Sequence, residues 1–133
     1  MRKLLNIIFI IFAIIVFQNG CAHYSNEKMM ISEKLINAPA DIVWDETLKL
    51  LPKERISILL ANPVDRSIHA KKDITFWSDG DAVNIKIIPF NDNQTILNLE
   101  VKSNNQFIGW GHEERLGKIL FSKIKANSED RNK

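Results

Sequence analysis

The sequence predicts an α+β protein, a two-layer sandwich in which an antiparallel sheet of about four to five strands is packed by an early helix and a C-terminal helix. Three observations support this fold class. A helical pattern lies early in the chain, several segments of alternating polar and apolar residues follow it, and a second helical pattern comes last. Antiparallel sheets of this kind bury one face under helices.

The domain organisation follows from the length and the first residues. A chain of 133 residues is long enough for one domain and too short for two with separate cores. We expect residues 1–20 to form a signal peptide and residues 21–28 a linker. Residues 29–126 then form a single α+β domain, and residues 127–133 form a polar tail.

The first expected strand lies within residues 29–36, and the clearest helix follows it in "NAPADIVWDETLKLLP". Asn37 or Ala38 is the expected cap, and Pro39 fits the first turn. Pro52 is expected to stop the helix. Its apolar face combines Val43, Thr47, Leu50 and Leu51.

Strands are expected next at residues 55–61 and 66–72, with a turn between them. After a tight turn at residues 78–81, two alternating segments at 82–90 and 95–103 form the most secure hairpin. The alternation places six apolar residues of this hairpin on the inner face: Val83, Ile85, Ile87, Leu97, Leu99 and Val101.

The last element, "HEERLGKILFSKIKA", is an expected helix. Its apolar residues recur at helical spacing, and acidic residues in the first turn with lysines in the last suit the helix dipole. The apolar positions are Leu116, Ile119, Leu120 and Ile124.

The first seventeen residues have the pattern of an export signal. Arg2 and Lys3 precede an apolar stretch from Leu4 to Phe17, which is shorter than the roughly 20 residues that a membrane-spanning helix needs. A short uncleaved anchor is the alternative. From Cys21 onward there are 16 basic and 16 acidic side chains, so the basic balance belongs to the signal and indicates no nucleic-acid partner.

Gly20-Cys21-Ala22 resembles the lipobox of bacterial lipoprotein precursors, although Gln18 stands where that family normally has an aliphatic residue. The resemblance implies that Cys21 is a lipidation site, acylated with chains such as palmitate, and holds the domain on the lipid bilayer. Because Ala22 is not Asp, it also implies a place in the cell envelope at the outer membrane, facing the periplasm. An inert thiol and a catalytic cysteine are the alternatives.

Two further resemblances concern the mature part. Its "VW…LKLL" helix, its hairpin and its closing "ILFSKIK" helix are similar to small envelope lipoproteins of unknown function. Separately, "INAPADIVWDETLKLL", residues 36–51, resembles the first strand–helix junction of the START/polyketide-cyclase lipid-binding fold. That fold normally has more strands around its cavity and a long closing helix.

No catalytic, cofactor or metal site is predicted, so we expect no enzyme. "HEERL" begins like a zinc-protease motif, but Leu116 stands where the second histidine would be. We expect His112 to be solvated and His69 to lie on the polar face of a strand. Asp79-Gly80-Asp81 lacks the ligand spacing of a calcium loop and is typical of a hairpin turn.

The most unusual segment is "NNQFIGWGHEER", residues 104–115. Phe107, Ile108 and Trp110 are the candidate contacts for a partner or ligand, and the alternative is that they cap the open end of the core. Our first hypothesis is a non-enzymatic, membrane-anchored domain that binds another envelope protein or acts as a scaffold. The second is a small-ligand or lipid-binding module with a helix-grip-like cavity.

Overall fold

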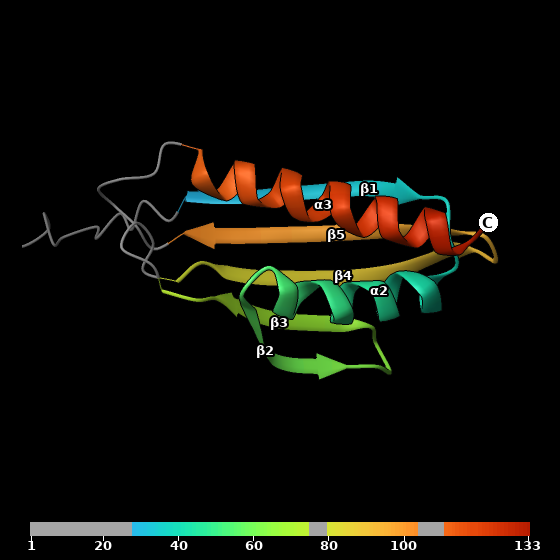
Figure 1. The fold of residues 1–133 in the computed structure, drawn as a ribbon, viewed down its shortest axis with the longest axis horizontal. Helices are drawn as coiled ribbons and strands as arrows, with labels where there is room; N and C mark the ends of the chain where they lie inside the picture. Colours follow the sequence, from blue (N-terminus) through green and yellow to red (C-terminus); the bar gives the residue numbers. More distant parts are fainter. Residues whose placement is uncertain (1–27, 75–79, 104–110) are drawn as a thin grey trace, which may run out of the picture.

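The computed structural model describes residues 28–74, 80–103 and 111–133. It confirms the α+β class (Figure 1). The elements in chain order are β1 (Lys28–Ile36), α2 (Ala40–Lys53), β2 (Ile56–Asn62), β3 (Ser67–Lys72), β4 (Ala82–Asn91), β5 (Gln94–Ser103) and α3 (His112–Arg131).

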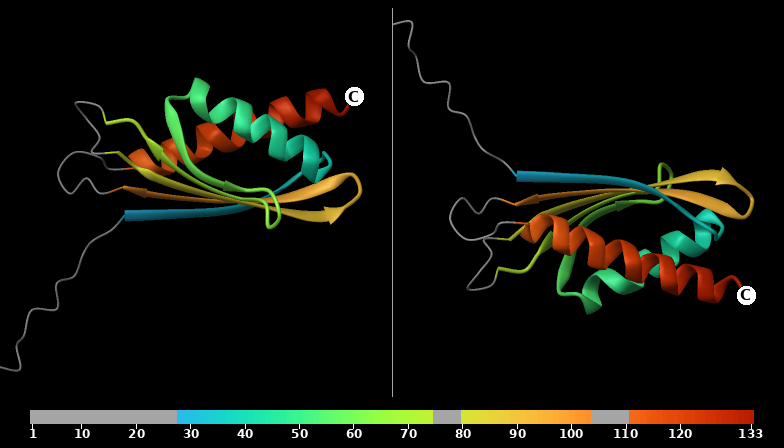
Figure 2. Two further views of the ribbon diagram at one scale, coloured as in Figure 1. Left: turned by 90° about the horizontal axis from the view of Figure 1, so that it is seen from below. Right: turned by 90° about the horizontal axis from the view of Figure 1, so that it is seen from above.

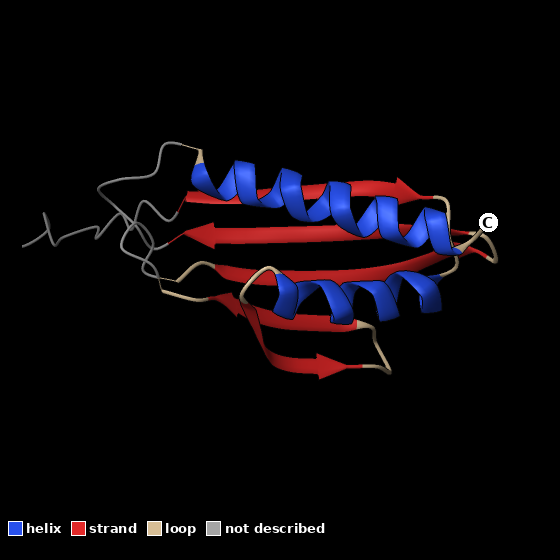
Figure 3. Ribbon diagram, viewed as in Figure 1, coloured by secondary structure: helices blue, strands red, loops and turns tan. Residues whose placement is uncertain are grey.

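The five strands form one antiparallel sheet in the order β1-β5-β4-β3-β2. Both helices lie on the same face of this sheet, which makes two layers (Figures 2 and 3). Helix α3 packs against β1 and β5, and α2 packs against β2, β4 and β5. The first and last strands of the chain are therefore neighbours, with the last helix lying across them.

The core lies between the sheet and the helices, and the predicted hairpin supplies much of it. Leu97, Leu99 and Val101 of β5 and Val83 of β4 are completely buried, as the alternation predicts. Leu120 and Ile124 of α3 cover them and are also completely buried. Each such aliphatic side chain contributes about 1.5–3 kcal/mol by leaving water. Trp44 packs at the edge of this core and is partly buried.

A glycine lets the start of α3 lie directly on the sheet. A Cβ atom at Gly117 would overlap the Sδ of Met30 on β1, and it would lie 3.7 Å from Val101 Cγ2 on β5. Glycine in a helix interior costs about 1 kcal/mol relative to alanine. At position 117 it allows a close contact between α3 and the β1–β5 pair.

The structure corrects three expected boundaries near the first helix. Strand β1 begins at Lys28, inside the expected linker. Pro39 is the N-cap of α2 with no side-chain hydrogen bond, so neither Asn37 nor Ala38 caps the helix. Pro52 lies inside the last turn, where its missing N–H costs a single hydrogen bond, and α2 continues to Lys53.

The expected polar tail is wrong in its structure, because α3 continues to Arg131. Ser128 is completely buried and Arg131 lies 3.2 Å from Asp45 and 3.0 Å from Glu46 of α2. These contacts across to α2 stabilise the last turns of a segment that is polar in sequence.

The sandwich has two ends that matter for function. We call the loop end the one where β1, β4 and α3 begin, at Lys28, Ala82 and His112. We call the turn end the opposite one, which carries the turn between β4 and β5 and the last residues of α3 (Figure 1).

Candidate functional site

The inner face of the sheet changes from apolar to polar at the loop end. Along β5 the inward positions run through Leu97, Leu99 and Val101 and end at Ser103, which is 6% exposed. Just before β4, Asp81 continues the inward parity of that strand and is 1% exposed. A buried carboxylate in a sheet-and-helix core is uncommon, because desolvation of its charge is costly.

The backbone holds Asp81 in place by extending the sheet beyond β4. The N–H of Lys72, at the end of β3, donates to the carbonyl of Asp81 at 2.8 Å. Gly80, just before it, has a φ of +89°, a conformation that favours glycine. The backbone hydrogen bond to Lys72 and the conformation of Gly80 together direct the Asp81 side chain into the sandwich.

The nearest polar side chain to the Asp81 carboxylate comes from the start of α3. His112 Nδ1 lies 3.0 Å from Asp81 Oδ2, and the histidine side chain is 35% exposed. Gly111, with a φ of +78°, caps the helix and sets the direction of its first residue. Next to His112, the Oε2 atom of Glu113 is buried without a hydrogen bond among the described residues.

Asp81 and His112 lie close together, but the hydrogen-bonding capacity of the Asp81 carboxylate is not fully used among the described residues. Although the two atoms lie at ion-pair distance, Asp81 Oδ2 has no hydrogen-bond partner among the described residues. Burying a carboxylate oxygen without a hydrogen-bond partner costs free energy, so an additional donor would stabilise it. The pair can therefore accept a hydrogen bond from a ligand group at the loop end, while His112 connects it to the surface.

The outer face of the sheet carries a second polar network. His69 Nδ1 lies 2.8 Å from Asn84 Oδ1, Asn84 Nδ2 donates to Glu100 Oε2 at 3.1 Å, and Lys102 lies 3.1 Å from Glu100. The Asn84 hydrogen bond, followed by that of Lys102, lowers the pKa of Glu100. As predicted, His69 is exposed on the polar face. This network is typical of a solvated sheet surface, since cross-strand pairs satisfy it.

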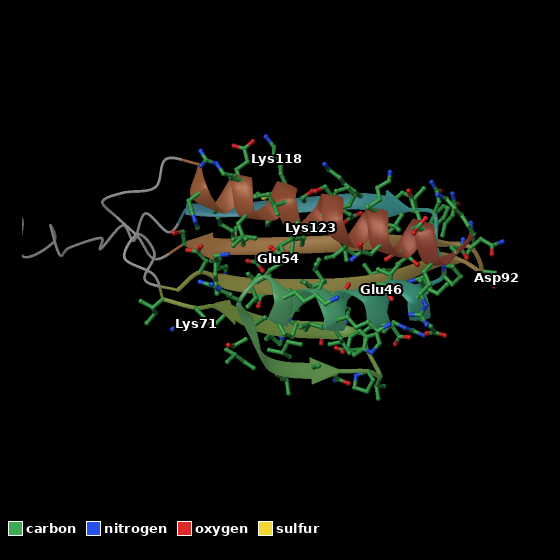
Figure 4. The ribbon with its side chains drawn as sticks, viewed as in Figure 1. Glu46, Glu54, Lys71, Asp92, Lys118 and Lys123 are labelled. Carbon is green, nitrogen blue, oxygen red and sulfur yellow. The ribbon has the colours of Figure 1, made fainter. Side chains whose placement is uncertain are left out.

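Ion pairs between the two helices form a third cluster, and it is structural. Lys123 lies 2.5 Å from Glu54, and Arg131 contacts Asp45 and Glu46 (Figure 4). A hydrogen bond from Lys49 is the main cause that lowers the pKa of Glu46, and the Arg131 bond adds to it against the effect of burial. These pairs connect α2 to α3.

The structure does not describe every residue that the sequence singled out. Cys21, Phe107, Ile108 and Trp110 lie outside the described residues. Within the described residues there is no group of three His, Cys, Asp or Glu side chains that could hold a metal ion. A search of the same part of the chain finds no helix with the length and apolar character of a membrane span.

Sequence reasoning missed the Asp81–His112 pair. It expected Asp81 in a plain turn and His112 in water, whereas the structure brings the two together. One signal was available: Asp81 shares its parity with Val83, Ile85 and Ile87, which the alternation places inward. An acidic residue on the inner side of a strand pattern indicates a buried charge in need of a partner.

Comparisons with known proteins bear on the fold. No protein-family model matches the sequence, and no curated protein matches it. Among solved structures, the chain is similar to the di-domain aromatase/cyclase BexL from the BE-7585A biosynthetic pathway, with a TM-score of 0.60 and 12% identity. That match covers 77% of this chain and 46% of BexL, so the chain spans about half of that protein's length.

Two further structures share the architecture over their whole length. A START superfamily protein from Mycobacterium smegmatis has a TM-score of 0.52 and 11% identity over 78% of this chain and 96% of its own. Norcoclaurine synthase from Thalictrum has a TM-score of 0.50 and 13% identity over 79% and 96%. The fold is therefore a START/polyketide-cyclase-like helix-grip fold. The resemblance of residues 36–51 to that fold is confirmed at the level of structure.

Proposed function

We propose that the chain is a membrane-anchored domain of the bacterial cell envelope that binds a small amphipathic ligand at the loop end. The observation that carries this proposal is the buried Asp81 carboxylate, one oxygen of which has no hydrogen-bond partner among the described residues, and which faces the partly exposed His112. The helix-grip fold supports it, because one similar structure, the norcoclaurine synthase point mutant, is a complex with a transition state analogue. The proposed role is binding without catalysis.

The surroundings of Asp81 define the chemistry of the ligand. Behind it, Val83 and Val101 begin the apolar interior, which Leu99 and Leu120 fill further in. A ligand at this end would meet the Asp81–His112 pair first, and its apolar part would have to displace the packing of the completely buried Val83 and Val101. We expect a molecule with an apolar body and a hydroxyl, amide or amine donor that reaches Asp81.

A lipid anchor on Cys21 would hold this site near a bilayer. Residues 1–27 join the domain at Lys28, the first residue of β1, which is paired with Ser103 at the loop end. If Cys21 is acylated, residues 22–27 span at most about 20 Å even when fully extended. The loop end then stays close to the membrane surface, which suits an amphipathic ligand.

Bound small molecules provide the test of binding. The full chain is purified from membranes, extracted with organic solvent and analysed by liquid chromatography and mass spectrometry, beside the variants Asp81→Asn and Asp130→Asn. Asp130 is an exposed carboxylate that pairs only with Lys133 among the described residues, so it is the matched control. We expect a compound that is reduced at least tenfold in Asp81→Asn and unchanged in Asp130→Asn. Equal amounts from all three proteins would overturn the site.

The anchor is tested separately by intact mass. We expect the protein from membranes of a Gram-negative host to begin at Cys21 and to carry acyl chains, and we expect Cys21→Ser to lose both. A full-length mass that the substitution leaves unchanged would contradict lipidation without affecting the ligand site.

A second candidate function is the binding of another envelope protein, and the outer edge of the sheet favours it. On β1, Met29, Ile31 and Leu35 all point away from the helices and are 50%, 59% and 41% exposed. Apolar side chains on an exposed edge strand are a usual mark of protein contact. Crosslinking in the native envelope should give an adduct that Ile31→Ser abolishes and Asp81→Asn does not.

A further inference from the structure

We propose that the turn end carries a second binding site, specific for an uncharged, polyhydroxylated ligand such as an oligosaccharide. An open pocket of about 510 Å³ lies there. All of its lining residues are polar, and five of the six are amides: Asn37, Asn91, Asp92, Asn93, Gln94 and Asn132. The inference is independent of the ligand proposed for the loop end.

Three distant parts of the chain build this pocket. Asn37 follows β1, Asn91 and Gln94 are the last residue of β4 and the first of β5, and Asn132 follows α3. Asn132 Nδ2 donates to the Asn37 carbonyl at 3.2 Å, which brings the end of the chain to the end of β1. A hairpin turn alone would not place amides from all three segments around one space.

Hydrogen bonds fix the amides in a chain. Gln94 Nε2 donates to Asn37 Oδ1 at 2.9 Å, and Asn91 Nδ2 donates to Gln94 Oε1 at 2.9 Å. The N–H of Asn93 donates to Asn91 Oδ1 at 2.9 Å. The backbone N–H of Asn37 donates to Glu129 Oε1 of α3 at 3.0 Å. The lining is thus preorganised, which lowers the entropic cost of binding.

The remaining hydrogen-bonding atoms select the ligand. Because the side-chain oxygens of Asn37, Asn91 and Gln94 already accept hydrogen bonds, their remaining NH₂ hydrogens are available as donors. Asp92 lies at the tip of the turn (Figure 4) and makes no hydrogen bond or ion pair among the described residues, so its carboxylate is an acceptor. Donors beside one strong acceptor match hydroxyl groups, each of which both donates and accepts.

The charge of the lining excludes other ligand classes. It contains no lysine or arginine and one carboxylate, so phosphate and other anions are disfavoured. A hard cation such as calcium needs six or more oxygen ligands, whereas three of the amide oxygens here already face N–H donors. A neutral sugar is the ligand that satisfies both constraints.

The test uses the ¹⁵N-labelled full chain in a zwitterionic detergent without sugar groups, titrated with chitotriose and followed by NMR. We expect saturable shifts of the side-chain NH₂ signals of Asn37, Asn91 and Gln94, with a dissociation constant in the millimolar range. Asp92→Ala and Asn132→Ala should each weaken binding about tenfold, as expected for the loss of one or two hydrogen bonds. The matched control is Asn127→Ala, an exposed amide of α3 outside this pocket, and it should bind like the unmodified chain.

Three results would overturn the site. These are the absence of saturable shifts with chitotriose, shifts that persist unchanged in both Asp92→Ala and Asn132→Ala, and shifts centred on residues of the loop end. Neither test variant removes a buried side chain, because both residues are exposed. Their amide spectra report directly whether the fold is retained.

Discussion

At the turn end, hydrogen bonds connect β1, the β4–β5 turn and the end of α3, and completely buried side chains fill the space beneath them. Ile36 and Thr95 are both 0% exposed there, and Thr95 Oγ1 donates to the carbonyl of Ala38 at 2.7 Å. At the loop end, the contacts between α3 and the sheet include the approach of His112 to Asp81, the close packing at Gly117 and the burial of Leu116 in the core. One oxygen of the buried Asp81 carboxylate has no hydrogen-bond partner within the part of the chain that the structure describes.

Because of this difference, the two proposed sites would bind a ligand in different ways. At the turn end the amides are hydrogen-bonded to one another, so a ligand would bind to groups already in place. The loop end holds a charge whose desolvation is only partly compensated, so a ligand would complete an unfinished set of contacts. The four predictions below test this contrast, from the largest expected effect to the smallest.

Two truncations on the inner face of β1 compare the packing of the ends. Ile36→Ala should lower the free energy of unfolding by about 3 kcal/mol, because the side chain is completely buried. Met30→Ala should cost about 1 kcal/mol, because Met30 is only partly buried. Urea unfolding followed by circular dichroism measures both. Equal losses would show that the two ends are packed alike.

Removal of the Thr95 hydroxyl tests the hydrogen bonding of the turn end. Thr95→Val should destabilise the fold by about 2 kcal/mol, because the buried carbonyl of Ala38 loses its side-chain donor. Ser57→Ala, which removes an exposed hydroxyl bonded to Asp73, should change stability by less than about 0.5 kcal/mol. If thermal unfolding moved equally for the two variants, the turn end would not depend on this bond.

Neutralisation of Asp81 tests the loop end. We expect Asp81→Asn to change the free energy of unfolding by less than about 1 kcal/mol, although it removes a buried charge, because the substitution also removes the desolvation cost. His112 is 35% exposed, so water can solvate it once its partner is lost. Chemical denaturation against Asp130→Asn measures the change. A loss above about 3 kcal/mol would mean that the pair is a structural element of the fold.

The smallest effect concerns the ion pairs that Arg131 of α3 makes with α2. The pKa of Glu46 is lowered from 4.5, so the stabilisation it provides is present above pH 4.5 and is lost as the pH falls through its folded-state pKa. Arg131→Ala should therefore lower the melting temperature only slightly at pH 7, as for exposed pairs, and leave it unchanged well below pH 4.5. Melting temperatures at the two pH values measure the difference, with the control Lys53→Ala, an exposed lysine of α2 that has no ion pair among the described residues. A cost that is independent of pH would contradict the role of Glu46.

Local patterns were sufficient for most of the fold and insufficient for the sites. The alternation in β4 and β5 predicted the hairpin and its inward residues, because period-two burial is a property of neighbouring residues. The last turns of α3 were missed because Ser128 and Arg131 are polar, and the partners of Arg131, Asp45 and Glu46, lie about 85 residues earlier in the chain. Such contacts leave no local signal.

By itself, the sequence determined the α+β class, the order of strands and helices and the inner face of the hairpin, since each depends on the spacing of apolar residues along a short segment. The tertiary structure alone decided that Asp81 meets His112 and that Asn37, Gln94 and Asn132 surround one pocket. Those groups are brought together by strand pairing between the first and last strands and by α3 crossing the sheet. The physical reason is that burial and hydrogen bonding across the fold, rather than local preference, choose which polar side chains become neighbours.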